Sequence, residues 1–369
     1  MKYKCPNPLV PLIFCGITLF AQESDSWGQN PDIAVSGFAD IYYVYDFNRP
    51  QGSSRQPFLY NHNRHNEFNL NLGFLKLGVE HQKYRANVVL QAGTYANDNY
   101  AAEPGLLKSI FEANIGLSLN KQNNLWIDAG VLPSHLGFES AISMQNLTLT
   151  RSLSAENSPY FLAGAKLTFT PNDQWEIAAL MVNGWQRIQR LQGNSLASFG
   201  TQVSFSHTER MSFNWSTFVG TDDPDATRRM RYFNNFYGRF QLNEQVEVIA
   251  GVDIGTQQRS GNSSVYDVWF SPVIIAQLGI SENWKTAFRA EYYQDRTNII
   301  VQANPGDGFE TTGLSLNLDY VPSVNLMCRL EGRWLNGNDG LFERQRRAVR
   351  DNLFVAASIA IQFSERIGD

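Results

Sequence analysis

The feature that most constrains the fold is the unequal length of successive connections between residues 125 and 186. The segments LWIDAGV (125–131) and SPYFLAGAKLTFT (158–170) both place apolar residues at every second position. A long stretch separates these two segments, whereas only PNDQ separates the second from WEIAALMVNGW (175–185). Long outer loops that alternate with short periplasmic turns are typical of outer-membrane β-barrels. The pattern therefore predicts an all-β, antiparallel, up-and-down transmembrane barrel.

The same alternation continues along the chain and predicts sixteen strands, with fourteen or eighteen as the alternatives. An even number leaves both ends of the chain on the periplasmic side, as bacterial barrels require. In the second strand the apolar positions change from even to odd near Gly73 and Phe74, which predicts a β-bulge. The predicted strands are 32–47, 64–80, 83–95, 108–120, 125–131, 158–170, 175–185, 197–207, 211–221, 230–242, 246–257, 264–280, 284–296, 309–321, 324–335 and 352–363.

The N-terminus has the pattern of an export signal, with Lys2 and Lys4 followed by an apolar run from Leu9 to Ala21. This run is too short to cross a bilayer as a helix, so we expect cleavage near Ala21. The prediction is a signal peptide at 1–21 and a single barrel domain at 22–369. Without the signal, 28 Lys and Arg face 35 Asp and Glu, which argues against a nucleic-acid partner.

Metal-binding and catalytic patterns are weak. Only Cys328 lies outside the predicted signal peptide, and one cysteine forms neither an internal disulfide nor a zinc site. The pair His62-x-x-His65 would bind metal only if its loop supplied further ligands. His135 and Glu139 lack the nucleophile and base spacing of a hydrolase. We therefore expect no cofactor, no metal and no enzymatic activity.

Aromatic residues make up 13% of the chain, although its overall hydropathy is slightly polar. A barrel predicts this combination because only alternate residues face lipid and aromatic residues gather at the two membrane interfaces. A soluble β-sandwich is the alternative. The tryptophans expected in the interfacial girdle are Trp126, Trp175, Trp215, Trp284 and Trp334. The predicted location is the outer membrane, in contact with lipid and lipopolysaccharide.

One part of the chain resembles a known family. Arg151-Ser152, Pro159-Tyr160, Gly164 and the run Asn183-Gly184-Trp185 are similar to motifs of the putative β-barrel porin-2 (OmpL-like) family. Upstream, that family's Gly-Pro-Gly-Phe/Tyr-Glu run is matched by Gly130, Pro133, Gly137, Phe138 and Glu139. The resemblance implies an outer-membrane, porin-like barrel without catalytic residues.

Charged residues on the less apolar face of each strand are distributed unevenly. Acidic residues on the early strands, Asp40, Asp46, Glu112, Asp128 and Glu176, would face basic residues on later strands, Arg239, Lys285, Arg289, Arg329 and Arg333. Such walls orient polar solutes and filter ions in a water-filled pore. The alternative is that these are ordinary solvated or mutually paired charges, with Glu291 and Glu331 as nearby partners.

The long connection at 132–157 is the candidate constriction. Connections of this length are usually functional or disordered, and its apolar residues argue against disorder. We expect this third outer loop to include a helix between 140 and 154 and to fold into the lumen. It would bring Glu139, Arg151 and Glu156 toward the basic wall. The alternative is a lid over the outer mouth.

The predicted function is passive diffusion of small hydrophilic solutes or ions through a polar lumen. A non-conducting barrel that acts as an adhesin, receptor or structural protein is the alternative. Four arginines in the last outer loop, Arg344, Arg346, Arg347 and Arg350, would contact lipopolysaccharide phosphates or form an ordinary solvated loop. The sequence leaves open whether the barrel forms a homo-oligomer. We expect Leu316 to face lipid and Asn317 to face the lumen.

Overall fold

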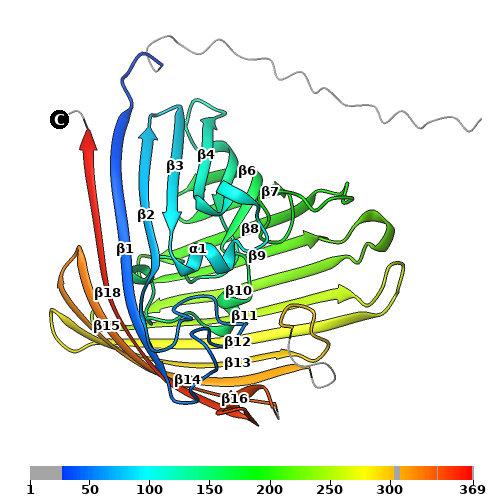
Figure 1. Cartoon of the computed structure of the whole chain (residues 1–369). Coiled ribbons are helices and arrows are strands. Elements are labelled where there is room, and N and C mark those ends of the chain that lie inside the picture. Colours follow the sequence, from blue (N-terminus) through cyan, green and yellow to red (C-terminus); the bar gives the residue numbers. More distant parts are fainter. Residues whose placement is uncertain (1–26, 303–307, 339, 368–369) are drawn as a thin grey trace, which may run out of the picture.

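Sixteen antiparallel strands form a closed barrel, as the sequence predicts (Figure 1). The computed structural model describes residues 27–302, 308–338 and 340–367, so the predicted signal peptide lies outside the described residues. The barrel strands are β1 (Asp32–Asp46), β2 (Phe68–Glu80), β3 (Tyr84–Ala92), β4 (Ile110–Ser118), β5 (Leu125–Pro133), β6 (Phe161–Asn172), β7 (Trp175–Val182), β8 (Ser198–Thr208), β9 (Met211–Gly220), β10 (Arg231–Gln241), β11 (Val246–Gln258), β12 (Tyr266–Gly279), β13 (Trp284–Asp295), β14 (Phe309–Ser323), β15 (Leu326–Gly337) and β18 (Asp351–Ile367).

Short helices and one hairpin occupy the connections. They are α1 (Thr94–Asn99), η2 (Gly105–Ser109), η3 (Ser143–Gln145), α2 (Leu153–Glu156), η4 (Asp225–Thr227) and the hairpin of β16 (Phe342–Arg344) and β17 (Arg347–Val349). The strand predicted at 83–95 ends earlier because Gly93, at a φ of 124°, turns the chain into α1. No helix among the described residues is long and apolar enough to cross a membrane.

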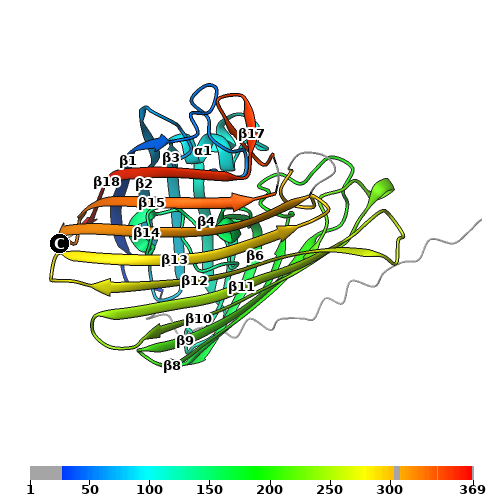
Figure 2. The same cartoon turned by 90° about the horizontal axis from the view of Figure 1, so that it is seen from below.

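The first and last strands close the barrel. β1 pairs with β2 on one side and with β18 on the other, with Ile33 opposite Ile367 and Asp46 opposite Phe354. The beginning of β1 and the end of β18 lie at the end of the barrel that carries the short turns (Figure 2). The longer loops lie at the opposite end. The predicted alternation of long and short connections is therefore confirmed.

The two faces of each strand differ as expected for a membrane barrel. Leu316 points outward with 63% of its surface exposed, whereas the next residue, Asn317, is fully buried inside the barrel. In β2, the register with β1 shifts so that Leu70 and Leu72 pair with consecutive residues and Asn71 is the bulged residue. This bulge explains the change of phase that the sequence shows and lies slightly before the predicted position.

The prediction that Trp126 belongs to the outer aromatic girdle is wrong. Its ring faces the lumen, where it lies 4.5 Å from the guanidinium carbon of Arg85, and its indole N–H donates to the carbonyl of Asn123. Trp126 has the same parity as the lumenal Asp128, so strand alternation places it inside. The other four tryptophans are exposed by 37–46%; they are Trp175, Trp215, Trp284 and Trp334.

Candidate pore and the loop inside it

Loop 3, defined here as residues 134–160 between β5 and β6, lies inside the barrel, as predicted. Arg329 of β15 donates to the carbonyls of Ser143 at 2.6 Å and Asn146 at 3.1 Å. Asn317 of β14 accepts the backbone N–H of Leu149 at 3.0 Å. The helix expected between 140 and 154 is reduced to η3 and to α2, which begins at Leu153.

Two ion-paired arginines hold the middle of loop 3 against the wall formed by β13 and β15. Arg289 lies 2.8 Å from Glu331 and donates to the carbonyl of Thr150 at 2.6 Å. Glu331 in turn accepts the backbone N–H of Thr150 at 2.6 Å. Arg333 lies 2.6 Å from Glu291. Because these groups are fully buried, their charges are neutralised locally and do not face open water.

The distribution of charge in the lumen therefore differs from the expectation of two facing walls. Arg289, Arg329 and Arg333 lie beneath loop 3, and Arg329 is also paired with Asp319 at 2.7 Å. Loop 3 fills the space between these arginines and the rest of the lumen. The sequence predicted that the loop approaches this wall, but not that it buries these arginines away from the open lumen, because the contacts that decide this join residues far apart along the chain.

Loop 3 also has an internal clamp. Arg151 is fully buried and donates to the carbonyls of Ser140 at 2.6 Å, Ala141 at 2.7 Å and Leu149 at 2.7 Å. The carboxylate of Glu139 accepts hydrogen bonds from the backbone N–H and the hydroxyl of Ser152. Arg151 thus stabilises the shape of the loop from within. Burial raises the pKa of Glu139, against the opposing effect of Arg289.

The C-terminal part of loop 3 contacts loop 1, defined here as residues 47–67. Glu156 accepts the backbone N–H of Tyr60 at 2.8 Å and the backbone and side-chain amides of Asn61 at 3.2 and 3.1 Å. Asn61 also donates to the Tyr160 hydroxyl at 3.2 Å. Burial raises the pKa of Glu156 to about 7, although these donors favour the ionised form. We call these contacts the loop 1–loop 3 latch.

An open hollow of about 950 Å³ lies along the inner faces of β2 to β8. Its lining includes Asn123, Asn172 and Asp173, which lie at or beside short turns, so the hollow opens toward the short-turn end. A second pocket of about 390 Å³ adjoins it and shares Lys76 and Glu112 as lining residues. This pocket reaches up to loop 3. The two spaces adjoin each other on the side of the barrel that loop 3 leaves open.

The hollow is more acidic than basic. Its charged lining consists of five carboxylates, Glu80, Glu112, Asp128, Asp173 and Glu176, against three cations, Lys76, Arg85 and Lys166. The cations are paired with Glu112 at 4.0 Å, Asp128 at 2.6 Å and Glu176 at 3.8 Å, respectively. His135 adds no charge near neutral pH, because burial lowers its pKa to about 4. The lining therefore has an excess of negative charge.

The remaining predicted residues lie in different places. Asp40 is buried beneath loop 1, where its carboxylate is 2.9 Å from Nε2 of His62. Arg239 donates to the carbonyl of Phe138 at 2.8 Å and so contacts loop 3. Lys285 lies next to the first residue of β13, near the short-turn end. Three of the predicted wall residues line the described hollow, namely Glu112, Asp128 and Glu176, and Glu112 and Glu139 line the adjoining pocket.

A third cavity, of about 250 Å³, lies on the long-loop side and is lined by Tyr60, Arg187 and Asp222 among others. Glu156 to Ser158 line this outer cavity, whereas Pro159 and Tyr160 line the inner pocket. Residues 156–160 therefore form the partition between the two spaces. The latch to loop 1 holds that partition in place.

Sequence reasoning missed several residues of the open lumen. Lys76, Arg85 and Lys166 lie among the acidic residues of β2 to β6, although their alternation with outward apolar residues was a signal that could have identified them. Phe111 gave no such signal, because a register shift in β4 places it out of the ordinary alternation. Among the described residues there is no group of three or more His, Cys, Asp or Glu that could hold a metal ion.

The structure is similar to solved structures of outer-membrane proteins. An anion-selective porin from Comamonas acidovorans superposes with a TM-score of 0.61 at 8% identity, covering 90% of this chain and all of that chain. OmpT, an outer-membrane protein of Vibrio cholerae in a trimer form, superposes with a TM-score of 0.61 at 8% identity, covering 91% of this chain and all of that chain. The outer-membrane channel DcaP of Acinetobacter baumannii superposes with a TM-score of 0.59 at 12% identity, covering 90% of this chain and 98% of that chain. At these identities the similarity establishes the fold alone.

Sequence comparison adds information that the fold alone does not give. A family model described as "putative beta-barrel porin-2, OmpL-like" matches residues 32–363. The match runs from the first strand into the last and so covers nearly the whole barrel. No curated protein sequence matches this chain.

Proposed function

Because this chain belongs to the putative beta-barrel porin-2, OmpL-like family, we propose that it is an outer-membrane porin that lets small hydrophilic solutes or ions diffuse passively. The observation that supports this best is the polar hollow inside a closed sixteen-strand barrel, next to a loop that narrows the lumen. Outward apolar side chains and inward polar ones let such a barrel span lipid while it holds water inside. The mechanism requires no covalent chemistry.

The proposed route runs along β2 to β8. A solute from the short-turn end enters the hollow, reaches the pocket beside loop 3 and passes the partition at 156–160 to the outer cavity. Loop 3 is the constriction, because it fills the lumen next to β13 to β15 and leaves only the side next to β2 to β8 for the solute. In this proposal Glu139, Arg151 and Glu156 shape the constriction, while Arg289, Arg329 and Arg333 anchor it.

The excess of carboxylates in the hollow supports a preference for cations. Fixed charges in a narrow, water-filled lumen raise the local concentration of counter-ions and exclude ions of the same sign. The arginines that would favour anions are buried and paired beneath loop 3. We therefore expect the channel to be weakly cation-selective.

Planar-bilayer recording tests this function with one loop variant. Wild-type protein should give repeatable single-channel steps, and deletion of Ser143 to Ser152 should increase their size. A short glycine-serine linker should join Ile142 to Leu153 in this variant, because Arg151 reaches the carbonyl of Ala141 through its side chain and the two backbone ends are not adjacent. The wall arginines keep their carboxylate partners without the loop. Equal conductance in the folded deletion variant would contradict the constriction.

A non-conducting barrel is the second candidate, and the partition at 156–160 is the observation that favours it. Folded wild-type protein that gives no current steps in any salt would support it. We further propose that the barrel catalyses no reaction and binds no cofactor. The exposed arginines of the β16–β17 hairpin, Arg344, Arg346 and Arg347, are proposed to contact lipopolysaccharide phosphates. Assembly into a homo-oligomer stays a prediction.

A further inference from the structure

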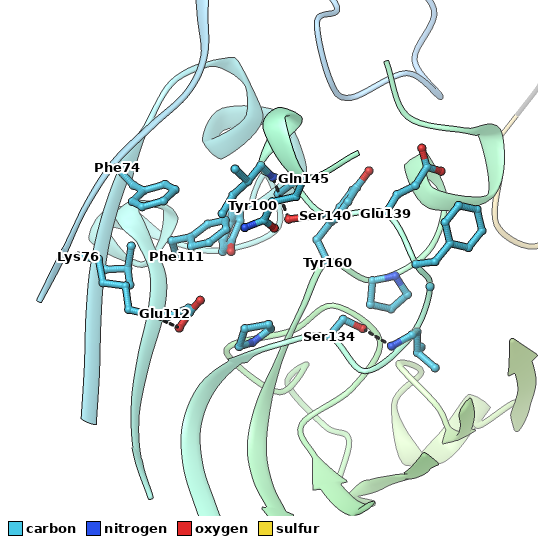
Figure 3. A pocket seen from close by; sticks show the side chains of 18 of the residues that line it. Phe74, Lys76, Tyr100, Phe111, Glu112, Ser134, Glu139, Ser140, Gln145 and Tyr160 are labelled. Carbon is cyan, nitrogen blue, oxygen red and sulfur yellow. Dashed lines mark hydrogen bonds and ion pairs between the residues drawn. The ribbon is translucent and has the colours of Figure 1, made fainter. Parts of the chain in front are cut away.

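The pocket beside loop 3 has features that a simple passage for water and ions does not need. It adjoins the hollow through Lys76, Glu112 and Ser134, so a solute can reach it without crossing loop 3. Its volume of about 390 Å³ is near the lower end of the range for pockets that enclose a small organic molecule. Figure 3 shows aromatic side chains around an open centre, with the polar groups between them (Figure 3).

A β-bulge builds the aromatic part of this pocket. The register between β3 and β4 shifts so that Val89 pairs with Glu112 and Leu90 pairs with Ile110, which leaves Phe111 as the bulged residue. Strict alternation would turn Phe111 toward lipid, but the bulge turns both Phe111 and Glu112 toward the lumen. Bulges commonly redirect a side chain at a functional site.

The redirected ring joins a second aromatic side chain on the neighbouring wall. The rings of Phe111 and Phe74 are nearly parallel, with centroids 5.5 Å apart and an angle of 10° between their planes. Tyr160 of loop 3 lies across the pocket from them. Aromatic faces left half-buried in a water-filled lumen are unfavourable unless an apolar surface covers them. The pocket therefore suits a ligand with at least one apolar face.

The charged groups of the pocket argue against a ligand with net charge. Nζ of Lys76 and the carboxylate of Glu112 are 4.0 Å apart and keep side-chain exposures of 35% and 14%. At this distance each retains hydrogen-bonding capacity for a ligand. An anion attracted by Lys76 would meet Glu112 and Glu139, whereas a cation attracted by the carboxylates would meet Lys76.

Two hydroxyl groups complete the polar part. Ser134 accepts the backbone N–H of Leu136 at 3.1 Å, and Ser140 accepts that of Ile142 at 3.1 Å. Each hydroxyl hydrogen can therefore be donated to a ligand. Lysine and hydroxyl donors thus stand beside a carboxylate acceptor, within reach of aromatic faces.

We propose that this pocket binds a neutral carbohydrate of one or two rings on its way through the channel. A sugar ring has an apolar C–H face that can pack on Phe74 and Phe111. Its hydroxyls both donate and accept hydrogen bonds, so they match Lys76 and Glu112 without any charge of their own. The proposal rests on the proposed channel function, because the pocket lies on the proposed route.

The test is the effect of glucose and maltose on the current through single channels in a bilayer. We expect a concentration-dependent, reversible reduction of the current. Phe111→Ala should raise the half-blocking concentration about tenfold, which is the change expected when one ring contact is lost. Phe169→Ala is the matched control, because Phe169 lies on β6 with its ring exposed on the outer face. It should leave the block unchanged.

A second measurement separates failure of this site from failure of the channel. Calorimetric titration of the folded protein in detergent with the same sugars reports binding even when no current flows. Binding without current steps would support the site and contradict the channel, whereas current steps without sugar block or binding would overturn the site alone. If phenylalanine blocks the current and the sugars do not, the pocket binds a zwitterion and the proposal is overturned. If Phe111→Ala does not fold, Glu112→Gln takes its place. This variant should show the same increase in the half-blocking concentration.

Discussion

Acidity should control the loop 1–loop 3 latch through one carboxyl group. Glu156 is 3% exposed, and burial raises its pKa from 4.5 to about 7. Arg151 and Arg333 are close enough to oppose this shift, but they do not cancel it. When the latch opens and Glu156 reaches water, its pKa should return to the ordinary value. The latched state therefore binds more protons than the open state between these two pH values.

The sign and size of the effect follow from this difference. Protonation favours the latched state, so its stability relative to the open state is greatest at low pH and falls as pH rises through about 7. A difference of about 2.5 pKa units at about 1.4 kcal/mol each corresponds to roughly 3 kcal/mol. Over the whole titration range that free energy changes the ratio of latched to open channels by roughly 100-fold or more, and between pH 5.5 and pH 8.5 by roughly 30-fold, because part of the titration lies below pH 5.5. We expect a larger open fraction at pH 8.5 than at pH 5.5.

Single-channel recording of Glu156→Gln at both pH values measures this effect. A glutamine keeps an oxygen that accepts the N–H groups of Tyr60 and Asn61 but cannot ionise. The variant should therefore stay latched at pH 8.5 and lose most of the pH dependence. Asp225→Asn is the control, because Asp225 lies in an exposed outer loop and hydrogen bonds from Ser195 lower its pKa to about 2. A full pH dependence in Glu156→Gln, or opening at low pH, would refute the reasoning.

Two further predictions concern the wall of the barrel and its charge. Val88→Arg should reduce the amount of folded protein in the outer membrane, because Val88 is 50% exposed on the outer face and an arginine near the membrane midplane costs about 2–4 kcal/mol. Asn87→Arg should assemble normally, since Asn87 lines the hollow, and equal loss of both variants from heat-modifiability gels would contradict this. The double variant Glu80→Gln, Asp173→Asn should lower the cation preference. An unchanged zero-current potential in a potassium chloride gradient would argue against control by the hollow.

The structure also limits the choice of lumenal control positions. Asn317 faces the lumen as predicted, but it is fully buried between loop 3 and Asp319. An arginine at this position would displace Leu149 from its hydrogen bond. The face of a strand residue can therefore be read from alternation, whereas the free space in front of it cannot. Asn87 is a better control because the hollow lies in front of it.

The sequence by itself determined the number of strands, their direction and the two faces of most of them. Each of these depends on local alternation and on the length of the next connection, both of which are visible within a few dozen residues. The apolar residues of loop 3 also predicted its position, because an apolar loop at the cell surface would be exposed to water. The family resemblance around Pro159 and Trp185 had the same local origin.

Only the tertiary structure decided which lumenal charges meet water. Arg289, Arg329 and Arg333 have the same alternation signal as Lys76 and Arg85, yet the first three are buried beneath loop 3 and the last two line the open hollow. The difference depends on where loop 3 lies across the barrel, which is set by hydrogen bonds between residues far apart in sequence. The bulge that turns Phe111 inward is likewise a matter of pairing between strands. Alternation fixes the direction of a side chain, but the packing of distant segments fixes its surroundings.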